Sequence, residues 1–537
     1  MEWHFATLWE SIADVIPERE AVACGEHRAT WQQWEDRSAR LAGAFAAAGL
    51  GPDSKIGLYL YNSVEYTEVQ FGAFKGRHVP INVNYRYLDD ELHYLLENSD
   101  AEALVFHRSL GDRVARIQER CPNVKLWVEV DDGGERVDGA VAYEDLVSSS
   151  DPMPRITRSD DDVYMLYTGG TTGMPKGVMY NMGSITQSFL TSGFPVLGMG
   201  LPESPDHAAS MIREAEHEGK LTTSIPACPM MHGTGGWVGT MMPHCAGATV
   251  VALEKRSFDA HELWATAERE RASQLVIVGD AFAKPMIKAL DEAKSQGRPY
   301  DTSSVKLIIS SGVMWTAEVK AELLEWGEFL LFDAMGSSEG AMATQITGCG
   351  TGSETARFAM SPTTKVFSED GRLIEPGSDE AGMVATSSNV PLGYYKDEKK
   401  SQATFKTIDG VRYSFPGDWA TVAADGTLTL LGRGSQCINS AGEKIYPEEV
   451  EEVVKLHDAI VDCLVVGIPD EKFGQCVAAV ASVSEGVELG EAELREFTKT
   501  KLSAFKAPKK ILLVPKVQRA PNGKADYKWA REVLTGG

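Results

Sequence analysis

The sequence DDVYMLYTGGTTGMPKGVMY, from Asp161 to Tyr180, holds the motif from which the rest of the chain is interpreted. Apolar residues from Val163 to Tyr167 predict a buried strand, and Gly177 to Tyr180 predict a second, short strand. Glycines between them let backbone N–H groups turn toward one concavity, while threonines add hydroxyl donors and a lysine adds charge. The sequence therefore predicts a phosphate-binding loop that comprises Thr168, Gly169, Gly170, Thr171, Thr172, Gly173 and Lys176.

The loop is not a Walker A motif, because that motif needs Gly directly before the Lys and Ser or Thr after it. Here Pro175 precedes Lys176 and Gly177 follows it. A bare GGTTG is equally typical of a flexible hairpin. The longer string TGGTTGMPKG resembles the signature of the adenylate-forming superfamily, which includes acyl-CoA synthetases, peptide-synthetase adenylation domains and beetle luciferases.

Size and charge narrow the classes of protein. At 537 residues the chain is longer than one core usually supports, so two or more domains are expected. Its 43% hydrophobic and 24% charged residues are typical of a globular protein. The formal charge of -25 argues against a nucleic-acid surface, because phosphate contacts need Lys and Arg.

The cysteines and the N-terminal sequence indicate a location. Eight cysteines show neither CxxC nor Cys/His ligand spacing, which predicts reduced thiols in the cytoplasm and no zinc site. The first 20 residues carry acids where a signal peptide needs a basic segment and an apolar one. No apolar run approaches the roughly 20 residues of a membrane span. Peripheral membrane contact and a homodimer are left open.

Strands and helices alternate along the first part of the chain. Strands are expected at Lys55–Tyr61, His78–Asn82 and Ala103–Phe106, with helices at Tyr66–Lys75 and Leu88–Asn98. This order predicts an α/β fold with a parallel sheet covered by helices. No residue before 150 carries obvious chemistry, so this region is interpreted as scaffold. Residues 198–222 are interpreted as a surface excursion or lid.

The polar, glycine-rich segment Gly432–Gln436 predicts a domain boundary. We expect a large N-terminal AMP-binding domain at 1–433, with several subdomains and parallel-rich sheets. A small, mobile α+β domain is expected at 434–537. The resemblance implies a hinge near this boundary, where relatives commonly have Asp or Lys and this chain has Ser435.

A single histidine at a strand end opens the segment SIPACPMMHGTGGWVGT, residues 224–240. A lone histidine is often a structural residue. The resemblance implies instead an acyl pocket, since relatives have an H-G-x-G run at this point in the chain. The residues assigned to this pocket are His232, Gly233, Gly235, Trp237, Asp280 and Val313, with His232 also a catalytic candidate.

Three predicted strands, Leu275–Val278, Lys306–Ser311 and Glu328–Phe332, each end in small polar residues. Ligands of open α/β sheets lie beyond such strand ends, so one shared cleft is expected. The resemblance implies that adenine and a metal bind there. The implied nucleotide contacts are Ser311, Gly312, Asp333, Met335, Gly336 and Ser338, and Glu339 is the implied Mg²⁺ ligand.

Two residues depart from the superfamily's aromatic-Gly-x-Thr-Glu pattern. Met335 replaces the aromatic residue and Ser338 replaces Thr. Further along, the resemblance implies that Asp418 accepts from both ribose hydroxyls, assisted by Arg433. It also implies a CoA-side loop with Ser440, Gly442 and Lys444, in which Ala441 departs from the usual Gly.

A lysine after Asn-Gly, such as Lys524, is ordinarily a solvated turn residue. In the superfamily this lysine enters the cleft, where it would bridge carboxylate and α-phosphate. With ATP, Mg²⁺ and CoA, Thr168, Glu339 and Lys524 would then support formation of an acyl-adenylate, followed by a thioester.

The sequence of residues 393–400 and 439–451 is similar to that of actinobacterial fatty-acyl-CoA synthetases, including enzymes for steroid side-chain acids. We therefore expect a CoA ligase for a medium-to-long or bulky hydrophobic acid. Two alternatives are an adenylating enzyme with a carrier protein or amine as acceptor, and a silent nucleotide-binding sensor. Retention of both Glu339 and Lys524 argues against the sensor.

Overall fold

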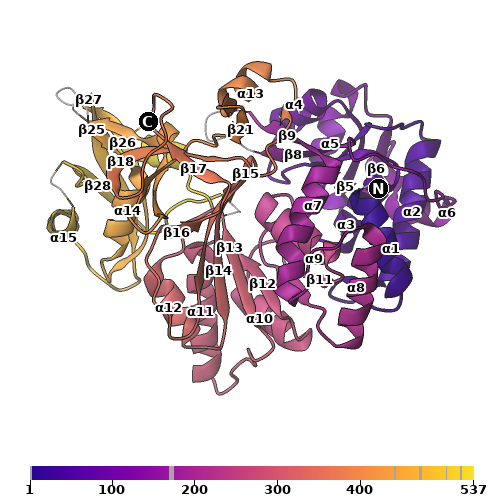
Figure 1. Cartoon of the computed structure of the whole chain (residues 1–537), viewed down its shortest axis with the longest axis horizontal. Coiled ribbons are helices and arrows are strands. Elements are labelled where there is room, and N and C mark those ends of the chain that lie inside the picture. The colour runs from indigo at the N-terminus through magenta and orange to yellow at the C-terminus, as the bar shows by residue number, and fades with distance from the viewer. Residues whose placement is uncertain are drawn as a thin grey trace.

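A computed structural model describes residues 3–168, 174–440, 443–470, 474–502, 505–520 and 523–536. These ranges include every side chain except those of Ser435, Asn439, Glu443 and Lys444. Figure 1 shows a large N-terminal part and a smaller C-terminal part, coloured orange to yellow, packed against one side of it. This arrangement confirms the predicted α/β class with a small second domain; the boundary after residue 433 stays a prediction.

An entirely parallel sheet forms the N-terminal scaffold, as predicted, with strand order β4-β3-β5-β6-β7. Its strands are β3 (Lys55–Tyr59), β4 (Val79–Asn82), β5 (Ala101–His107), β6 (Leu126–Val130) and β7 (Val141–Ala142). The helices around it are α2 (Trp31–Ala47), α3 (Val64–Lys75), α4 (Asp89–Ser99), α5 (Gly111–Ile117) and α6 (Tyr143–Ser149). Thr30 caps α2 in a capping box with Gln33, which fixes the predicted start of that helix.

A second sheet has 15 strands among the described residues and runs through the middle of the molecule. Its first half is β2 (His27–Thr30), β1 (Glu20–Cys24), β11 (Thr249–Ala252), β10 (Thr223–Pro226), β12 (Gln274–Ile277), β13 (Leu307–Ser311) and β14 (Leu330–Ser337), in that order. Neighbours from β1 to β14 pair in parallel. Helices α10 (Ala260–Arg269), α11 (Asp280–Ser295) and α12 (Ala317–Leu324) pack against this half.

The second half of this sheet is antiparallel. It continues through β15 (Gly340–Thr347), β16 (Arg357–Met360), β23 (Thr427–Arg433), β22 (Asp418–Val422), β18 (Ser378–Thr386), β21 (Val411–Ser414) and β20 (Phe405–Ile408), with β17 (Thr364–Phe367) beside β18. The strand predicted to end at Phe332 is longer than expected, because β14 pairs with β15 as far as Ser337. The segment predicted to contact adenine is therefore a strand and a tight turn.

Strands β8 (Val163–Thr168) and β9 (Lys176–Asn181) pair antiparallel, with Thr168 opposite Lys176. The predicted phosphate loop joins them, and its residues Gly169 to Gly173 lie outside the described residues. Strand β19 (Gly393–Tyr394) adds to β9, so the segment before α13 (Glu398–Thr404) lies beside the strand that follows the loop.

The region predicted as a lid is part of the packed core. Helix α8 (Pro205–His217) packs against α1 (Phe5–Val15), and Ala208 and Ile212 are fully buried in the cluster around α1. Helices α7 (Met182–Gly193) and α9 (Met242–Cys245) complete this layer. No helix within the described ranges is both long and apolar enough to cross a membrane.

The small domain is a mixed sheet covered by helices. Its strands are β24 (Ile438–Ser440), β25 (Glu443–Ile445), β26 (Ile460–Asp470), β27 (Gly474–Val483) and β28 (Lys510–Val514). Its helices are α14 (Pro447–Lys455), α15 (Glu491–Lys501) and α16 (Tyr527–Thr535). Separate apolar clusters form on the two faces, one under α14 and α15 and one under α16. The small domain therefore has a core of its own.

Candidate functional site

The ends of β12, β13 and β14 lie side by side, as the sequence predicts. These strands are parallel neighbours, so the residues that follow them meet at one sheet edge. Ser311 ends β13, and Gly312 follows with φ +92°, a conformation that favours glycine. A methyl group placed at Gly312 would lie 3.7 Å from Thr234 Oγ1, which brings the histidine segment to the same edge.

Two predicted adenine contacts are occupied by protein groups. The Asp333 carboxylate accepts from Lys320 Nζ at 2.7 Å, and burial raises the pKa of Asp333 to about 6. Met335 packs into the apolar cluster with Met342 and Val384 and is 6% exposed. Gly336 follows at an irregularity in the pairing of β14 with β15. Contacts of these residues with adenine stay predictions.

The Glu339 carboxylate is held from a distant part of the chain. Glu339 lies in the turn between β14 and β15, and Tyr394 Oη donates to its Oε1 at 2.8 Å. Tyr180 Oη donates to the Ser338 carbonyl at 2.8 Å, which fixes the same turn. Tyr394 was not among the predicted site residues. The pairing of β19 with β9, which local sequence does not specify, brings Tyr394 to this turn.

Lys176, which follows the predicted phosphate loop, forms an ion pair with a protein carboxylate. Its Nζ pairs with Asp397 Oδ2 at 2.6 Å and lies 5.7 Å from the centre of the Tyr394 ring. Thr168 is half-buried at the end of β8. Lys176 therefore ties the strand after the loop to the segment that carries Tyr394.

Asp418 and Arg433 face each other across the ladder of β22 and β23, in direct register. Arg433 Nε donates to Asp418 Oδ1 at 3.3 Å. Burial raises the pKa of Asp418, with Arg433 opposing that shift and Glu339 adding to it. The pair forms a held carboxylate next to Glu339, which fits the predicted diol contact.

Lys524 belongs to the small domain and interacts electrostatically with the carboxylates of Glu339 and Asp418. Its turn is closed by the Ala520 N–H on the Lys524 carbonyl at 2.9 Å. A methyl group placed at Gly523 would lie 3.3 Å from Ala281 Cβ, so the turn is docked on the start of α11. Lys524 is exposed to solvent on one side. Desolvation and then Arg433 lower its pKa, whereas Glu339 and Asp418 raise it.

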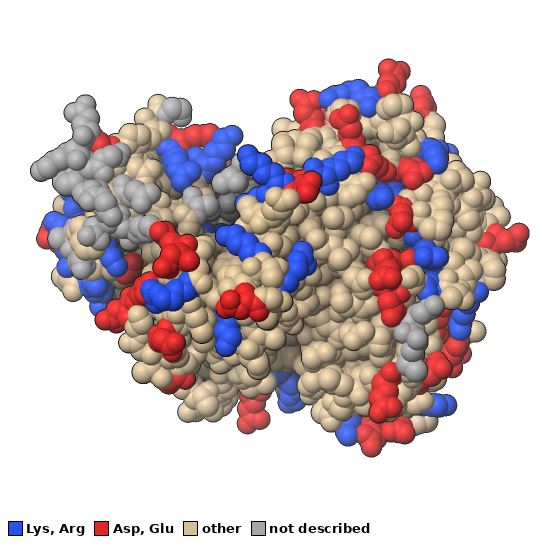
Figure 2. Space-filling model, turned by 45° about the horizontal axis from the view of Figure 1, so that its top comes forward, with Lys and Arg blue, Asp and Glu red and all other residues tan. Residues whose placement is uncertain are grey.

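Four residues, Glu339, Asp418, Arg433 and Lys524, form what we call the interdomain site. The charges of Glu339 and Arg433 act on both Asp418 and Lys524, and Asp418 and Lys524 act on each other. In Figure 2, Lys and Arg side chains gather beside the notch that separates the two sides of the molecule. The structure therefore joins residues that lie up to 185 positions apart, Glu339 to Lys524, into one mixed-charge site.

His232 is an uncharged residue near Lys524. Desolvation, followed by the charges of Lys524 and Arg86, lowers its pKa to about 3. Its Nε2 is buried without a hydrogen-bond partner among the described residues. A neutral imidazole can position a ligand by hydrogen bonding, but it does not supply a cation near pH 7. The catalytic assignment of His232 stays a prediction.

The glycines after His232 serve close packing of the backbone. A methyl group at Gly235 would lie 2.3 Å from the Pro229 carbonyl oxygen, so Gly235 leaves no room for a ligand itself. Gly233 is less confined, with Trp237 at 3.7 Å. Trp237 Nε1 donates to Tyr164 Oη at 2.7 Å, and the cavity beside it measures about 10 Å³. Of the residues assigned to the acyl pocket, only Trp237 lines this cavity, so the acyl pocket stays a prediction.

The other two pocket residues have structural partners. Asp280 begins α11 and accepts from Thr316 N at 2.9 Å and from Thr316 Oγ1 at 3.0 Å. Val313 packs against the cluster between α11 and α12. Ser440 is buried in β24, whereas Gly442 and the side chain of Lys444 lie outside the described residues. Contacts of these residues with substrate or CoA stay predictions.

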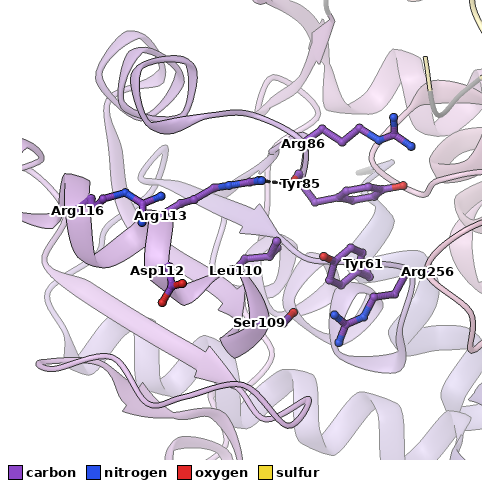
Figure 3. Close-up of a pocket in the computed structure, with 9 residues that line it drawn as sticks. All are labelled: Tyr61, Tyr85, Arg86, Ser109, Leu110, Asp112, Arg113, Arg116 and Arg256. Atoms are coloured by element: carbon purple, nitrogen blue, oxygen red, sulfur yellow. Dashed lines mark hydrogen bonds between the residues drawn. The ribbon is translucent and has the colours of Figure 1, made fainter. Parts of the chain in front are cut away.

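A second pocket of about 510 Å³ lies in the region interpreted from sequence as scaffold (Figure 3). It is lined by Tyr61, Tyr85, Arg86, Ser109, Leu110, Asp112, Arg113, Arg116 and Arg256. We call it the arginine pocket. Its segments follow the carboxyl ends of β3, β4, β5 and β11, which is the signal that could have found it from sequence.

The arginines of this pocket are held in different ways. Arg113 donates to the Tyr85 carbonyl at 2.8 Å and to Tyr59 Oη at 3.1 Å, both neutral groups. Arg116 pairs with Asp89 and Arg256 with Asp132, each at 2.6 Å. Arg256 also lies 4.6 Å from the centre of the Tyr61 ring. Figure 3 shows Arg86 and Tyr85 extending to the same side as Tyr61 and Arg256.

Comparisons with known proteins identify the family of the chain. Residues 9–395 match the family model for AMP-binding enzymes, and residues 449–524 match that for the C-terminal domain of the same enzymes. A 3-oxocholest-4-en-26-oate–CoA ligase of Rhodococcus rhodochrous is 40% identical, with 99% of this chain and 96% of that protein covered.

A medium/long-chain-fatty-acid–CoA/3-oxocholest-4-en-26-oate–CoA ligase of Mycobacterium marinum is also 40% identical, covering 98% of this chain and 96% of that protein. The crystal structure of an anthranilate CoA ligase with anthranoyl-AMP superimposes with a TM-score of 0.85 at 20% identity, covering 100% of this chain and 99% of that one. The chain belongs to the family of AMP-binding, adenylate-forming enzymes.

Proposed function

We propose that this enzyme is an AMP-forming acyl-CoA synthetase for hydrophobic carboxylic acids. The observation that carries the proposal is the docking of the Lys524 turn on the large domain, beside Glu339, Asp418 and Arg433. Full-length relatives at 40% identity are ligases of this kind. The proposed domains are 1–433, for binding of AMP, and 434–537, which carries the lysine.

In the first step the substrate carboxylate attacks the α-phosphate of ATP, and pyrophosphate leaves. Two anions must approach each other, so the barrier falls mainly through positioning and neutralisation of charge. We propose that Lys524 contacts both anions and that Asp418 accepts from the ribose hydroxyls. The pairing of Asp418 with Arg433 in direct register supports the second role. Thr168 stands at the entrance of the predicted phosphate loop.

Glu339 is the residue we propose as the Mg²⁺ ligand. One of its oxygens accepts from Tyr394, and a carboxylate with a fixed orientation suits a hard cation. Bound Mg²⁺ would neutralise phosphate charge. The chain's own contribution is to fix Glu339 through Tyr394 and, at the neighbouring Ser338 carbonyl, through Tyr180.

The acyl chain would enter beside Trp237. The cavity there is too small for a fatty acid, so the proposal requires Trp237 to swing out of its hydrogen bond with Tyr164. We propose that neutral His232 orients the acyl group, which its unpaired buried Nε2 supports. The names of the relatives support a medium-to-long fatty acid or a steroid side-chain acid.

In the second step CoA thiol attacks the acyl-adenylate and AMP leaves. We propose that the phosphates of CoA bind at the arginine pocket. Guanidinium groups suit phosphate oxygens, and the Tyr61 and Tyr85 rings suit adenine. Arg86 connects this pocket to the reaction centre, because its charge acts on His232. Residues Ser440 to Lys444 would then replace Lys524 after the small domain rotates.

Mass spectrometry of purified protein with ATP, Mg²⁺, CoA and a panel of acids tests this function. The panel contains fatty acids of increasing length and 3-oxocholest-4-en-26-oate. We expect acyl-CoA and AMP from at least one of them. Adenylate without thioester would point to a carrier protein or an amine as acceptor. Nucleotide binding without any adenylate would point to the sensor. A cytoplasmic location, where ATP and CoA are abundant, suits this chemistry.

A further inference from the structure

The Glu448 side chain belongs to the small domain and contacts the large domain across the predicted hinge. Glu448 stands in the first turn of α14, in the small domain. Its Oε1 accepts from the backbone N–H of Arg433 at 3.4 Å, at the end of the large domain's β23. Its Oε2 is buried without a hydrogen-bond partner among the described residues. One carboxyl group thus spans the connection between the domains.

Gly432 makes room for this carboxyl group. A methyl group placed at Gly432 would lie 2.1 Å from Glu448 Oε2, so any side chain at this position would displace the carboxyl group. Gly432 also has φ +127°, a conformation that favours glycine. The backbone conformation therefore favours glycine here, and the space that its missing side chain leaves is filled by Glu448.

The surroundings of Glu448 disfavour its negative charge. Asp418 on β22 and Glu451 on α14 are acidic, and Tyr527 on α16 is neutral. Arg433 on β23 opposes their effect with its N–H and its positive charge. Desolvation is the largest influence, and together with Glu451 it raises the pKa of Glu448 to about 8. An ionised carboxylate with one oxygen unpaired would be costly at this position. A protonated carboxyl group fits it.

The contact between Glu448 and Arg433 also involves the interdomain site, because Arg433 belongs to both. The Arg433 backbone is held by Glu448, while the Arg433 side chain is held by Asp418. The same arrangement docks the Lys524 turn on α11. Loss of the Glu448 contact therefore frees the hinge and weakens the placement of Arg433.

We propose that Glu448 is a positioning residue that, as a neutral carboxylic acid, latches the hinge in the arrangement with Lys524 in the site, and that its ionisation releases the small domain. The inference rests on the proposed function, because that function requires the small domain to rotate between two half-reactions. On release, the Oε2 proton passes to solvent and the carboxylate becomes hydrated.

The direction of the pH effect follows from linkage. The latched state binds the Glu448 proton more tightly than a released state in which the carboxyl group meets water. The latch is fully favoured below the ordinary pKa of Glu, about 4.3. As pH rises from there to about 8, the latched population falls relative to the released one, by up to about tenfold per pH unit.

Energy transfer between dyes on the two domains tests the inference without reference to activity. Positions 398 on α13 and 491 on α15 are exposed and take the dyes through non-natural residues. We expect the latched signal of the full-length protein to fall between pH 5 and 8. In E448Q, which is neutral and of the same size, the signal should stay latched and independent of pH.

Two neighbouring acids serve as controls. Glu449 pairs with Lys506 within the small domain at 2.6 Å, so E449Q should respond to pH as the wild type does. Glu452 faces Glu318 and Thr355 of the large domain, and its pKa is also raised, first by desolvation. A response that persists in E448Q, or is lost only in E452Q, would overturn the inference. So would a wild type that does not respond to pH.

Folding and function are checked in the same samples. Circular dichroism establishes that E448Q is folded, and Glu448→Met offers a second neutral variant that should also stay latched. ATP/pyrophosphate exchange is measured in parallel. Absence of exchange in the wild type would contradict the proposed function, whereas the dye signal alone decides the role of Glu448.

Discussion

Lys524 is the small domain's cation in a site with two acids, Glu339 and Asp418. Its position supports the proposed adenylation chemistry more directly than that of any other residue discussed above. We predict that Lys524→Ala lowers the rate of ATP/pyrophosphate exchange about 10²- to 10³-fold, the loss expected when one charge-stabilising contact is removed. Lys528→Ala, an exposed lysine on α16, should leave exchange unchanged. Wild-type exchange in Lys524→Ala would show that the assigned role is wrong.

Tyr394 carries a prediction of a different kind, because it orients the proposed metal ligand without carrying charge. Tyr394→Phe removes the hydroxyl that donates to Glu339 at 2.8 Å. A hydrogen bond to a charged group contributes about 1.5 to 3 kcal/mol. We expect the Mg²⁺ concentration for half-maximal exchange to rise roughly tenfold or more, with the rate largely restored at high Mg²⁺. An unchanged Mg²⁺ requirement would separate Tyr394 from the metal.

At the scale of elements, the parallel strands explain why both candidate binding regions lie where they do. Residues after β12 and β13 meet at the sheet edge on which the Lys524 turn docks, and residues after β3, β4, β5 and β11 meet at the arginine pocket. Loops at the carboxyl ends of parallel strands are not constrained by the ladder, so they can carry polar side chains. The arginine pocket and the docking edge for the Lys524 turn therefore follow from one property of the fold, whereas Asp418 and Arg433 come from the antiparallel pair of β22 and β23.

The arginine pocket gives the prediction that belongs to this scale. Arg86→Glu should raise the KM for CoA at least tenfold, because it removes a phosphate contact and adds repulsion. ATP/pyrophosphate exchange should be unaffected, since that half-reaction does not involve CoA. Arg120→Glu is the control, because Arg120 is exposed and pairs with Asp90 at the surface. An equal effect on exchange would mean that Arg86 serves the nucleotide or the fold.

At the scale of the whole molecule, buried ionisable groups link stability to pH. His244 packs among Trp9, Trp31 and Trp34, and its Nε2 contacts the Ala21 carbonyl at 3.1 Å. Desolvation lowers the pKa of His244 to about 4. The unfolded chain binds the proton more tightly, so stability is full above about pH 6.5 and falls as pH drops toward 4.

We predict that this histidine alone removes about 2 kcal/mol of unfolding free energy between pH 7 and pH 5, by linkage between those pKa values. His244→Gln should lower stability at pH 7 and flatten its dependence on pH. The exposed His261, which pairs with Glu292 at the surface, provides the control in His261→Gln. Urea unfolding at the two pH values measures both effects. An equal pH dependence in His244→Gln would contradict the assignment.

The sequence by itself determined the fold class, the alternation of strands and helices in the scaffold, and the family. These rest on local information: apolar period, the Thr30 capping box and the order of short motifs along one chain. Individual strand ends were also predicted well, because small polar residues follow β12 and β13 directly.

Only the tertiary structure decided which side chains meet. Tyr394 on Glu339, Lys320 on Asp333 and Glu448 at Gly432 join elements from different parts of the fold, and nothing in their local sequence specifies these partners. The extent of β14 was misjudged for the same reason, since its last residues are strand only because β15 pairs with them. Secondary structure follows from neighbours in sequence, whereas a site follows from the way the elements pack.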